Sequence, residues 1–217
     1  IQWIPKNPRW QNYVDIWTQI PLLTFVKNTV KITLVVTLLQ LFTSSFAAYA
    51  FAKMQFKGKN VLFLGYIATI AVPWQAYMVP QFMMMSSWHL NNTHLAIMCL
   101  QAFSAFGVFL MKQFYEGVPT ELCEAARIDG LSEYGIWWHI MLPLSLPALS
   151  TLTIFTFVNT WNDFLGPLIY LTKTELKTIQ IGLRMFITQY SAEYGLIMAA
   201  SVVALIPVLI VFLSLQK

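Results

Sequence analysis

The side chains best suited to ionic or acid–base chemistry are concentrated in one stretch of this chain, between residues 112 and 142. Five of the nine Asp and Glu residues lie there: Glu116, Glu121, Glu124, Asp129 and Glu133. Within it, the sequence CEAARIDG places Glu124, Arg127 and Asp129 on a short segment that ends in a glycine. Charged groups at this spacing can transfer protons or can pair with another protein, and the rest of the sequence distinguishes the two.

No catalytic arrangement accompanies these charges. A G-x-x-x-x-G-K-[S/T] phosphate loop is absent, because Gly58 and Lys59 are followed by Asn60. The sequence GLSEYG differs from the G-x-S-x-G nucleophile elbow, and there is no H-E-x-x-H motif. Cys99 and Cys123 form no C-x-x-C pair, so neither a disulfide nor a metal site is indicated. We therefore expect a chain that is not an enzyme and binds no cofactor itself.

A second group of polar residues lies inside an apolar run. Thr156, Asn159, Thr160 and Asp163 recur every three or four residues, hence on one helix face. Such residues inside a membrane span are candidates for a transport pathway, although Asn and Thr also join neighbouring helices, and the two interpretations carry equal weight here. Aromatic rings could come from Trp161 and from the region 74–77. The candidate translocation pathway is therefore Thr156, Asn159, Thr160, Trp161, Asn162 and Asp163.

A similar stripe occurs earlier in the chain, at Thr29, Thr33, Thr37, Gln40 and Ser44. Here we favour a packing role, because Thr and Ser hydroxyls often donate to the backbone of their own helix.

The elements that must hold these residues cross a membrane. The chain is 58% hydrophobic and only 10% charged, whereas soluble domains carry about 25% charged residues. A bilayer crossing takes about 20 apolar residues, and such runs occur at 29–50, 61–83, 93–111, 143–171 and 194–215. We expect an all-α, polytopic transmembrane helical bundle with about five spans. The net charge of +4 comes from scattered Lys and Arg residues, which does not indicate nucleic-acid binding.

Orientation does not follow from charge. Since connections alternate sides, loops 53–60 and 112–142 share a side, and basic residues divide evenly between the two sides. Five acids within loop 112–142 keep it out of the bilayer, because each buried acid costs about 3 kcal/mol.

The sequence of that loop predicts two short helices that meet at a glycine. Pro119 precedes the first helix, Thr120 is expected to cap it, and Gly130 is expected to end it. Ser132 is expected to cap the second helix, and Pro143 to stop it from continuing unbroken into the next span. Leu122, Ala125 and Ala126 are expected to share one face that another backbone can approach. From these features alone, a solvated loop helix is the simpler interpretation.

The full spacing adds a resemblance. Glu124-Ala125-Ala126, Gly130, Ile140 and Leu142-Pro143 reproduce E-A-A-x3-G-x9-I-x-L-P. This pattern resembles the cytoplasmic loop of permeases of binding-protein-dependent ABC importers. The segments AAYAFAKMQFKGKN (47–60), MVPQFMMM (78–85), NTWNDFLGPL (159–168) and the run 199–217 resemble the branch that imports maltose and multiple sugars.

The resemblance implies a type I importer permease: a single transmembrane domain over 1–217, with a further span upstream and cut ends. It implies a bacterial inner membrane protein whose residues 1–28 form an extracytoplasmic interfacial segment and whose loop 112–142 is the cytoplasmic coupling loop. The residues implied in ATPase coupling are Glu124, Ala125, Ala126, Arg127, Asp129, Gly130, Ile140, Leu142 and Pro143.

The implied partners are an ATPase dimer that uses ATP and Mg²⁺, a second homologous permease, an extracytoplasmic sugar-binding protein and the lipid bilayer, with no nucleic acid. Two other functions stay open: import of another solute such as a peptide or amino acid, and a membrane scaffold or sensor without transport.

Overall fold

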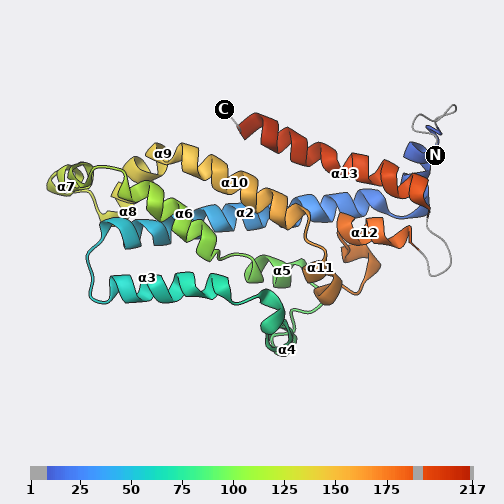
Figure 1. Ribbon diagram of the computed structural model, residues 1–217, viewed down its shortest axis with the longest axis horizontal. Helices are drawn as coiled ribbons and strands as arrows, with labels where there is room; N and C mark the ends of the chain where they lie inside the picture. Colours follow the sequence, from blue (N-terminus) through green and yellow to red (C-terminus); the bar gives the residue numbers. More distant parts are fainter. Residues whose placement is uncertain (1–8, 188–192, 216–217) are drawn as a thin grey trace.

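The chain folds into an elongated bundle of helices (Figure 1). The computed structural model describes residues 9–187 and 193–215. The α-helices are α1 (Asn12–Gln19), α2 (Leu22–Lys53), α3 (Lys59–Ala68), α4 (Met78–Ser87), α5 (His94–Leu100), α6 (Ala105–Glu116), α7 (Thr120–Ile128), α8 (Glu133–Ile136), α9 (Leu142–Leu144), α10 (Leu146–Trp161), α11 (Leu165–Tyr170), α12 (Ile179–Met185) and α13 (Tyr194–Leu215). Short helical turns are η1 (Thr69–Ala71), η2 (Trp74–Ala76), η3 (Trp137–Met141) and η4 (Thr174–Leu176).

Helix α2 is the centre of the bundle, with α6 and α10 alongside it (Figure 1). It extends beyond the expected span 29–50 at both ends, from Leu22 to Lys53. Small residues let α6 approach closely: a Cβ at Gly107 would collide with the Ser44 hydroxyl and lie 3.2 Å from Leu152. The packing of α2 against α6 therefore depends on a glycine at position 107.

The spans are less regular than the hydropathy predicts. Within the described residues, α2 and α13 alone are long and apolar enough to cross a membrane as single helices. The pair α5 and α6 is bent by 43°, and the helical stretch Glu133–Leu144 meets α10 at 80°. Counting each bent pair as one span gives up to four, and the apolar helix Lys59–Ala71 is shorter than a span.

The span expected over 61–83 is interrupted at Pro73. Val72 has an extended backbone and Pro73 follows it, because proline removes a helix hydrogen bond and disfavours a helical residue before it. The chain then turns through η2 into α4, which leaves the direction of α3 (Figure 1). Pro80 lies in the first turn of α4 and leaves that helix intact, because the first helical N–H groups need no partner within the helix.

The expected span 143–171 is also interrupted. Helix α10 ends at Trp161, and residues 162–164 separate it from α11. Pro143 does not end the preceding helix at once: a π-helical turn, η3, and α9 continue to Leu144, and the bend comes at Ser145.

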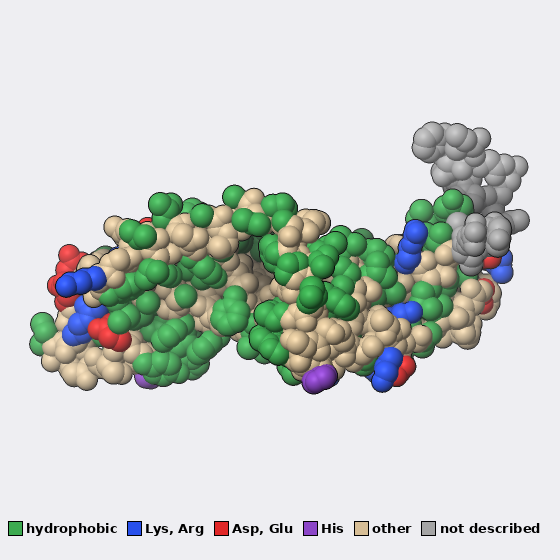
Figure 2. Space-filling model, turned by 90° about the horizontal axis from the view of Figure 1, so that it is seen from below, with side chains coloured by type: hydrophobic (Ala, Val, Ile, Leu, Met, Phe, Trp, Pro, Cys, Tyr) green, Lys and Arg blue, Asp and Glu red, His purple; other side chains and the backbone are tan. Residues whose placement is uncertain are grey.

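Charged side chains gather toward the two ends of the long axis, and the middle of the visible face is mostly hydrophobic (Figure 2). The exposed apolar side chains of the chain include Leu38, Val61 and Leu64, which are more than half exposed. An apolar belt between charged ends is the surface that a bilayer requires. The expected interfacial segment 1–28 contains α1, and the ring of Trp10, just before this helix, stacks on the ring of Tyr13 within it. Residues 1–8 lie outside the described part.

Candidate functional site

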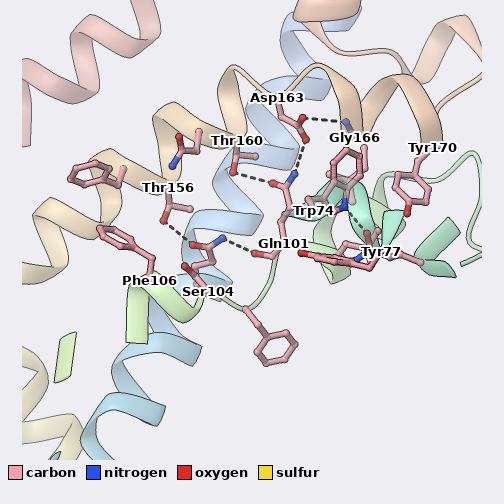
Figure 3. Close-up of a pocket in the computed structure, with 17 residues that line it drawn as sticks. Trp74, Tyr77, Gln101, Ser104, Phe106, Thr156, Thr160, Asp163, Gly166 and Tyr170 are labelled. Carbon is pink, nitrogen blue, oxygen red and sulfur yellow. Dashed lines mark hydrogen bonds between the residues drawn. The ribbon is translucent and has the colours of Figure 1, made fainter. Parts of the chain in front are cut away.

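Three interrupted helices meet at a cavity of about 610 Å³ (Figure 3). Its wall includes the turn before α4, the turn between α5 and α6, and the turn between α10 and α11. Backbone that leaves the helical path at membrane depth is tolerated where it is buried in protein or lines a cavity. The volume lies within the range of about 300–1,000 Å³ that is common for small-molecule sites.

One wall of the cavity is a chain of polar side chains that joins α10 to α2 and to the α5–α6 turn (Figure 3). The Thr156 hydroxyl donates to Gln40 Oε1 at 2.9 Å, and Gln40 Nε2 donates to the Gln101 carbonyl at 2.7 Å. Thr160 donates to Gln101 Oε1 at 3.1 Å, and Gln101 Nε2 donates to Asp163 Oδ2 at 2.7 Å. These bonds hold the side chains in fixed orientations, which a binding site requires.

Aromatic rings form other parts of the lining. Trp74 and Tyr77 lie to one side of the polar chain, and Phe106 lies to the other (Figure 3). Trp74 is fixed by a hydrogen bond of 2.8 Å from its indole nitrogen to Gln81. The helix break at Pro73 brings Trp74 and Tyr77 to this wall, as expected for the 74–77 region.

The candidate pathway residues divide into two groups. Thr156, Asn159, Thr160 and Asp163 line the cavity. The structure corrects the other two: Trp161 is 1% exposed and donates to the Ala204 carbonyl of α13, and Asn162 bonds to Gln180 and its own helix. Trp161 lies about 100° around the helix from Thr160, and Asn162 follows the last residue of α10, where its amide turns back to the Val158 carbonyl.

Residue spacing alone does not identify the two glutamines that organise the cavity. The stripe on α2 favours helix packing for Gln40, and no polar stripe includes Gln101. The available signal was an amide inside an apolar run, which is costly in lipid without a purpose. Gln101 ends α5 and bonds to both Thr160 and Asp163.

The stripe on α2 fits the packing interpretation only in part. Thr29 donates to the Phe25 carbonyl of its own helix and also accepts from the Ile179 backbone N–H. The hydroxyls of Thr33, Thr37 and Ser44 are buried without a hydrogen-bond partner among the described residues.

Loop 112–142 begins inside α6, which continues to Glu116, and then forms α7 and α8 at one end of the molecule (Figure 1). Pro119 rather than Thr120 occupies the cap position of α7, with no side-chain cap bond. Ser132 caps α8 as predicted, accepting from the Gly135 N–H at 3.2 Å.

Gly130 ends α7 as predicted. Its φ is +85°, the left-handed region that glycine tolerates best. The Gly130 N–H bonds to the Arg127 carbonyl and the Leu131 N–H to the Ala126 carbonyl, each at 3.0 Å. This pair of bonds is the Schellman motif. It fixes the turn between α7 and α8.

The two alanines of α7 differ in burial. Ala126 is 5% exposed and packs with buried Cys123 in the chain's own core, whereas Ala125 is exposed. The expectation that Leu122, Ala125 and Ala126 form one open face is therefore wrong for Ala126, because its inward position fills a gap against the core. The outward face consists of Glu121, Leu122, Glu124, Ala125, Ile128 and Asp129, with Ile128 87% exposed.

Arg127 pairs within the loop rather than facing outward freely. Its guanidinium donates to Glu133 Oε1 at 2.6 Å and Oε2 at 3.2 Å. This bond raises the pKa of Arg127 and lowers the pKa of the Glu133 carboxyl. The Tyr49 hydroxyl of α2 also donates to Glu133 Oε2, at 2.5 Å. Ile140 and Leu142 pack against the same core as Tyr49, and Pro143 is exposed.

A helical bundle with an apolar belt, charged ends and a polar cavity where helices are interrupted is typical of membrane-transport subunits. A solved bacterial ABC transporter involved in import of the acidic polysaccharide alginate has a chain with this fold. It superposes with a TM-score of 0.88 and 25% identity, covering 99% of this chain and 81% of that one. This confirms the predicted all-α bundle of the type I importer permease kind.

The chain belongs to the family described as binding-protein-dependent transport system inner membrane component, whose model matches residues 13–217. It is 37% identical to the arabinooligosaccharides transport system permease protein AraQ of Halalkalibacterium halodurans, over 98% of this chain and 77% of that protein. It is 36% identical to the lactose transport system permease protein LacG of Rhizobium radiobacter, over 95% of this chain and 76% of that protein. The resemblance seen in the sequence is confirmed.

Proposed function

We propose that this chain is the permease subunit of an ATP-driven sugar importer, in which it forms half of the translocation pathway. The observation that carries the proposal is the cavity, which places hydroxyl, amide and carboxylate groups opposite aromatic rings. The printed names of the relatives AraQ and LacG, which refer to arabino-oligosaccharides and lactose, support a sugar as the solute.

The cavity suits an uncharged polyol. Asn159 takes part in none of the side-chain hydrogen bonds found among the described residues, so its amide is available to a solute. Asp163 accepts one bond on each oxygen, from Gln101 and from the Gly166 N–H, and a carboxylate has room for about four. A sugar would donate its hydroxyls to these oxygens and rest its apolar faces on Trp74 or Tyr77.

Energy would come from a partner, because the chain lacks a phosphate loop. We infer that α7 is the contact for a separate ATPase dimer and that its end of the molecule is cytoplasmic. The exposed acids Glu121 and Glu124 and the 87% exposed Ile128 offer a mixed charged and apolar face for such a contact. The chain itself would be non-catalytic and would lie in the bacterial inner membrane.

The complete importer would contain a second homologous permease and an extracytoplasmic sugar-binding protein. Docking of the loaded binding protein and closure of the ATPase dimer would move the cytoplasmic helices and open the cavity outward. Hydrolysis would return it to the inward-facing state and release the sugar.

The test is uptake of radiolabelled arabino-oligosaccharide and lactose by a strain in which the gene is deleted and then restored. Asn159→Ala should raise the half-saturation concentration, because it removes a free amide from the cavity. Asn162→Ala is the matched control, since it removes the same group from a side chain that bonds to Val158 and Gln180 and does not line the cavity, and it should leave that concentration unchanged.

Uptake of labelled peptide in place of either sugar would favour the rival solute class. Normal uptake of every solute by the deletion strain would favour a scaffold or sensor. Equal effects of the two asparagine variants would show that the amide in the cavity does not contact the solute.

A further inference from the structure

The contacts of Glu133 are made to other helices of the chain and take no part in the outward face of α7. Glu133 begins α8, yet its carboxylate is shared by Arg127 at the end of α7 and by Tyr49 of α2. Tyr49 is 1% exposed, and its ring lies in the same core as the inward residues of α7. One carboxylate therefore joins three helices at a single point.

A second contact attaches the other end of α7 to the same helix. Lys53, the last residue of α2, is 6% exposed, and its ammonium group donates to the Val118 carbonyl at 2.5 Å. It also donates to the Thr120 hydroxyl at 3.4 Å. A buried ammonium needs such acceptors, because leaving it unpaired is costly. Helix α7 is thus bound to α2 before its first turn and after its last.

The covalent connections of α7 pass through non-helical or bent segments. On one side the chain passes through residues 117–119, and on the other it bends by 80° at Ser145 before it reaches α10. Helix α2 is continuous from Tyr49 to the cavity residue Gln40, as α6 is from Glu116 to the cavity residue Phe106, and α2 is the one that α7 and α8 contact through Glu133. Tyr49 and Gln40 are nine positions apart on the helix, a distance of about 14 Å at a rise of about 1.5 Å per residue.

We propose that Glu133 is a positioning residue that couples the loop helix α7 to α2 through Tyr49. Displacement of α7 by the ATPase then moves Gln40 at the cavity. The proposal rests on the proposed function, since it assumes an ATPase that pushes on α7. Because Gln40 bonds to both Thr156 and the Gln101 backbone, a shift of α2 changes the polar wall on both sides.

The test uses the assembled importer in proteoliposomes, with its binding protein and sugar, and measures sugar transported per ATP hydrolysed. The variants are Glu133→Gln, which weakens both contacts, and Tyr49→Phe, which removes only the hydroxyl and keeps the buried ring. Glu116→Gln is the control, because it removes an acid of the same loop whose ion pair with Lys112 lies within α6.

In Tyr49→Phe we expect ATPase co-purification and ATP hydrolysis to persist, while the sugar transported per ATP hydrolysed falls by about ten-fold. Loss of a charge-assisted hydrogen bond changes an equilibrium by about this factor. Glu133→Gln should fall at least as far, and Glu116→Gln should match the wild type. A merely structural role would lower the amount of complex and leave the ratio unchanged.

An unchanged ratio in Tyr49→Phe, with a wild-type complex that transports sugar, would overturn this inference alone. An equal fall in Glu116→Gln would also overturn it, because a general charge effect would then suffice. A wild-type complex without ATP-driven uptake would overturn the proposed function and this inference together.

Discussion

Replacing Gly130 tests whether the turn between α7 and α8 must keep its shape. Gly130 has φ +85°, and a Cβ added there meets no atom within 4 Å. The cost of Gly130→Ala is therefore the backbone cost alone, about 1–2 kcal/mol for an L-residue in the left-handed region. That energy corresponds to a factor of roughly 5–30 in the population of the observed turn.

The chain supplies its own control. Gly58, in the other loop at this end of the molecule, has φ +82° and likewise nothing within 4 Å of an added Cβ. Gly58→Ala should carry the same backbone cost, but it leaves the α7–α8 turn untouched. The two variants should lower the thermal stability of the detergent-solubilised importer equally.

Only Gly130→Ala should weaken co-purification with the ATPase and slow sugar uptake, by about 5- to 30-fold if the whole strain opposes docking. Gly130→Asn should lose less, because asparagine tolerates the left-handed region better than other residues with side chains. Equal losses of uptake in Gly58→Ala and Gly130→Ala would refute the reasoning, since strain anywhere in these loops would then account for both.

Three further changes test the packing and the loop. Trp161→Phe removes the donor to the Ala204 carbonyl and should destabilise the protein by about 1–3 kcal/mol, which would lower the melting temperature. An unchanged melting temperature would mean that this hydrogen bond is dispensable. Gly107→Ala should lower the stability by about 1–3 kcal/mol through overpacking. Adding Ser44→Ala should restore part of that stability, because the Ser44 hydroxyl is the nearest obstacle to the new Cβ; if it does not, another contact is limiting. Because the pKa of Glu133 is lowered, its ion pair adds stability above the ordinary glutamate pKa of about 4.3, and that stability is lost as the pH falls below this value. The melting temperatures of the wild type and Glu133→Gln should therefore converge at acidic pH. A difference in melting temperature that stays constant with pH would contradict the assignment.

Much of the fold is encoded in features that a sequence displays locally. The apolar runs predicted the helical bundle, and Ser132 and Gly130 predicted one helix start and one helix end, because capping depends on residues close in sequence. The cavity face of α10 was also predictable, since a spacing of three or four residues defines a helix face without any knowledge of neighbours.

The features that were missed depend on contacts between distant segments. Which alanine of α7 faces inward follows from the core formed with α2 and α6, so Ala125 and Ala126 cannot be told apart by residue type. Trp161 is a ring suited to a pathway, but the Ala204 carbonyl lies 43 residues away in sequence and attracts it to the opposite side. The role of Gln101 follows from its bonds to α10, which begin 59 residues further along the chain.

The interruptions that shape the cavity also bear on how the molecule forms in the bilayer. A half-helix that ends inside lipid leaves backbone groups unpaired, at a cost of several kcal/mol each, whereas α2 can cross as one uninterrupted helix. The broken segments α5–α6 and α10–α11 pack on α2 and on each other. Helix α2 is thus expected to settle in the membrane first and to act as the template on which the later, incomplete crossings gather during synthesis.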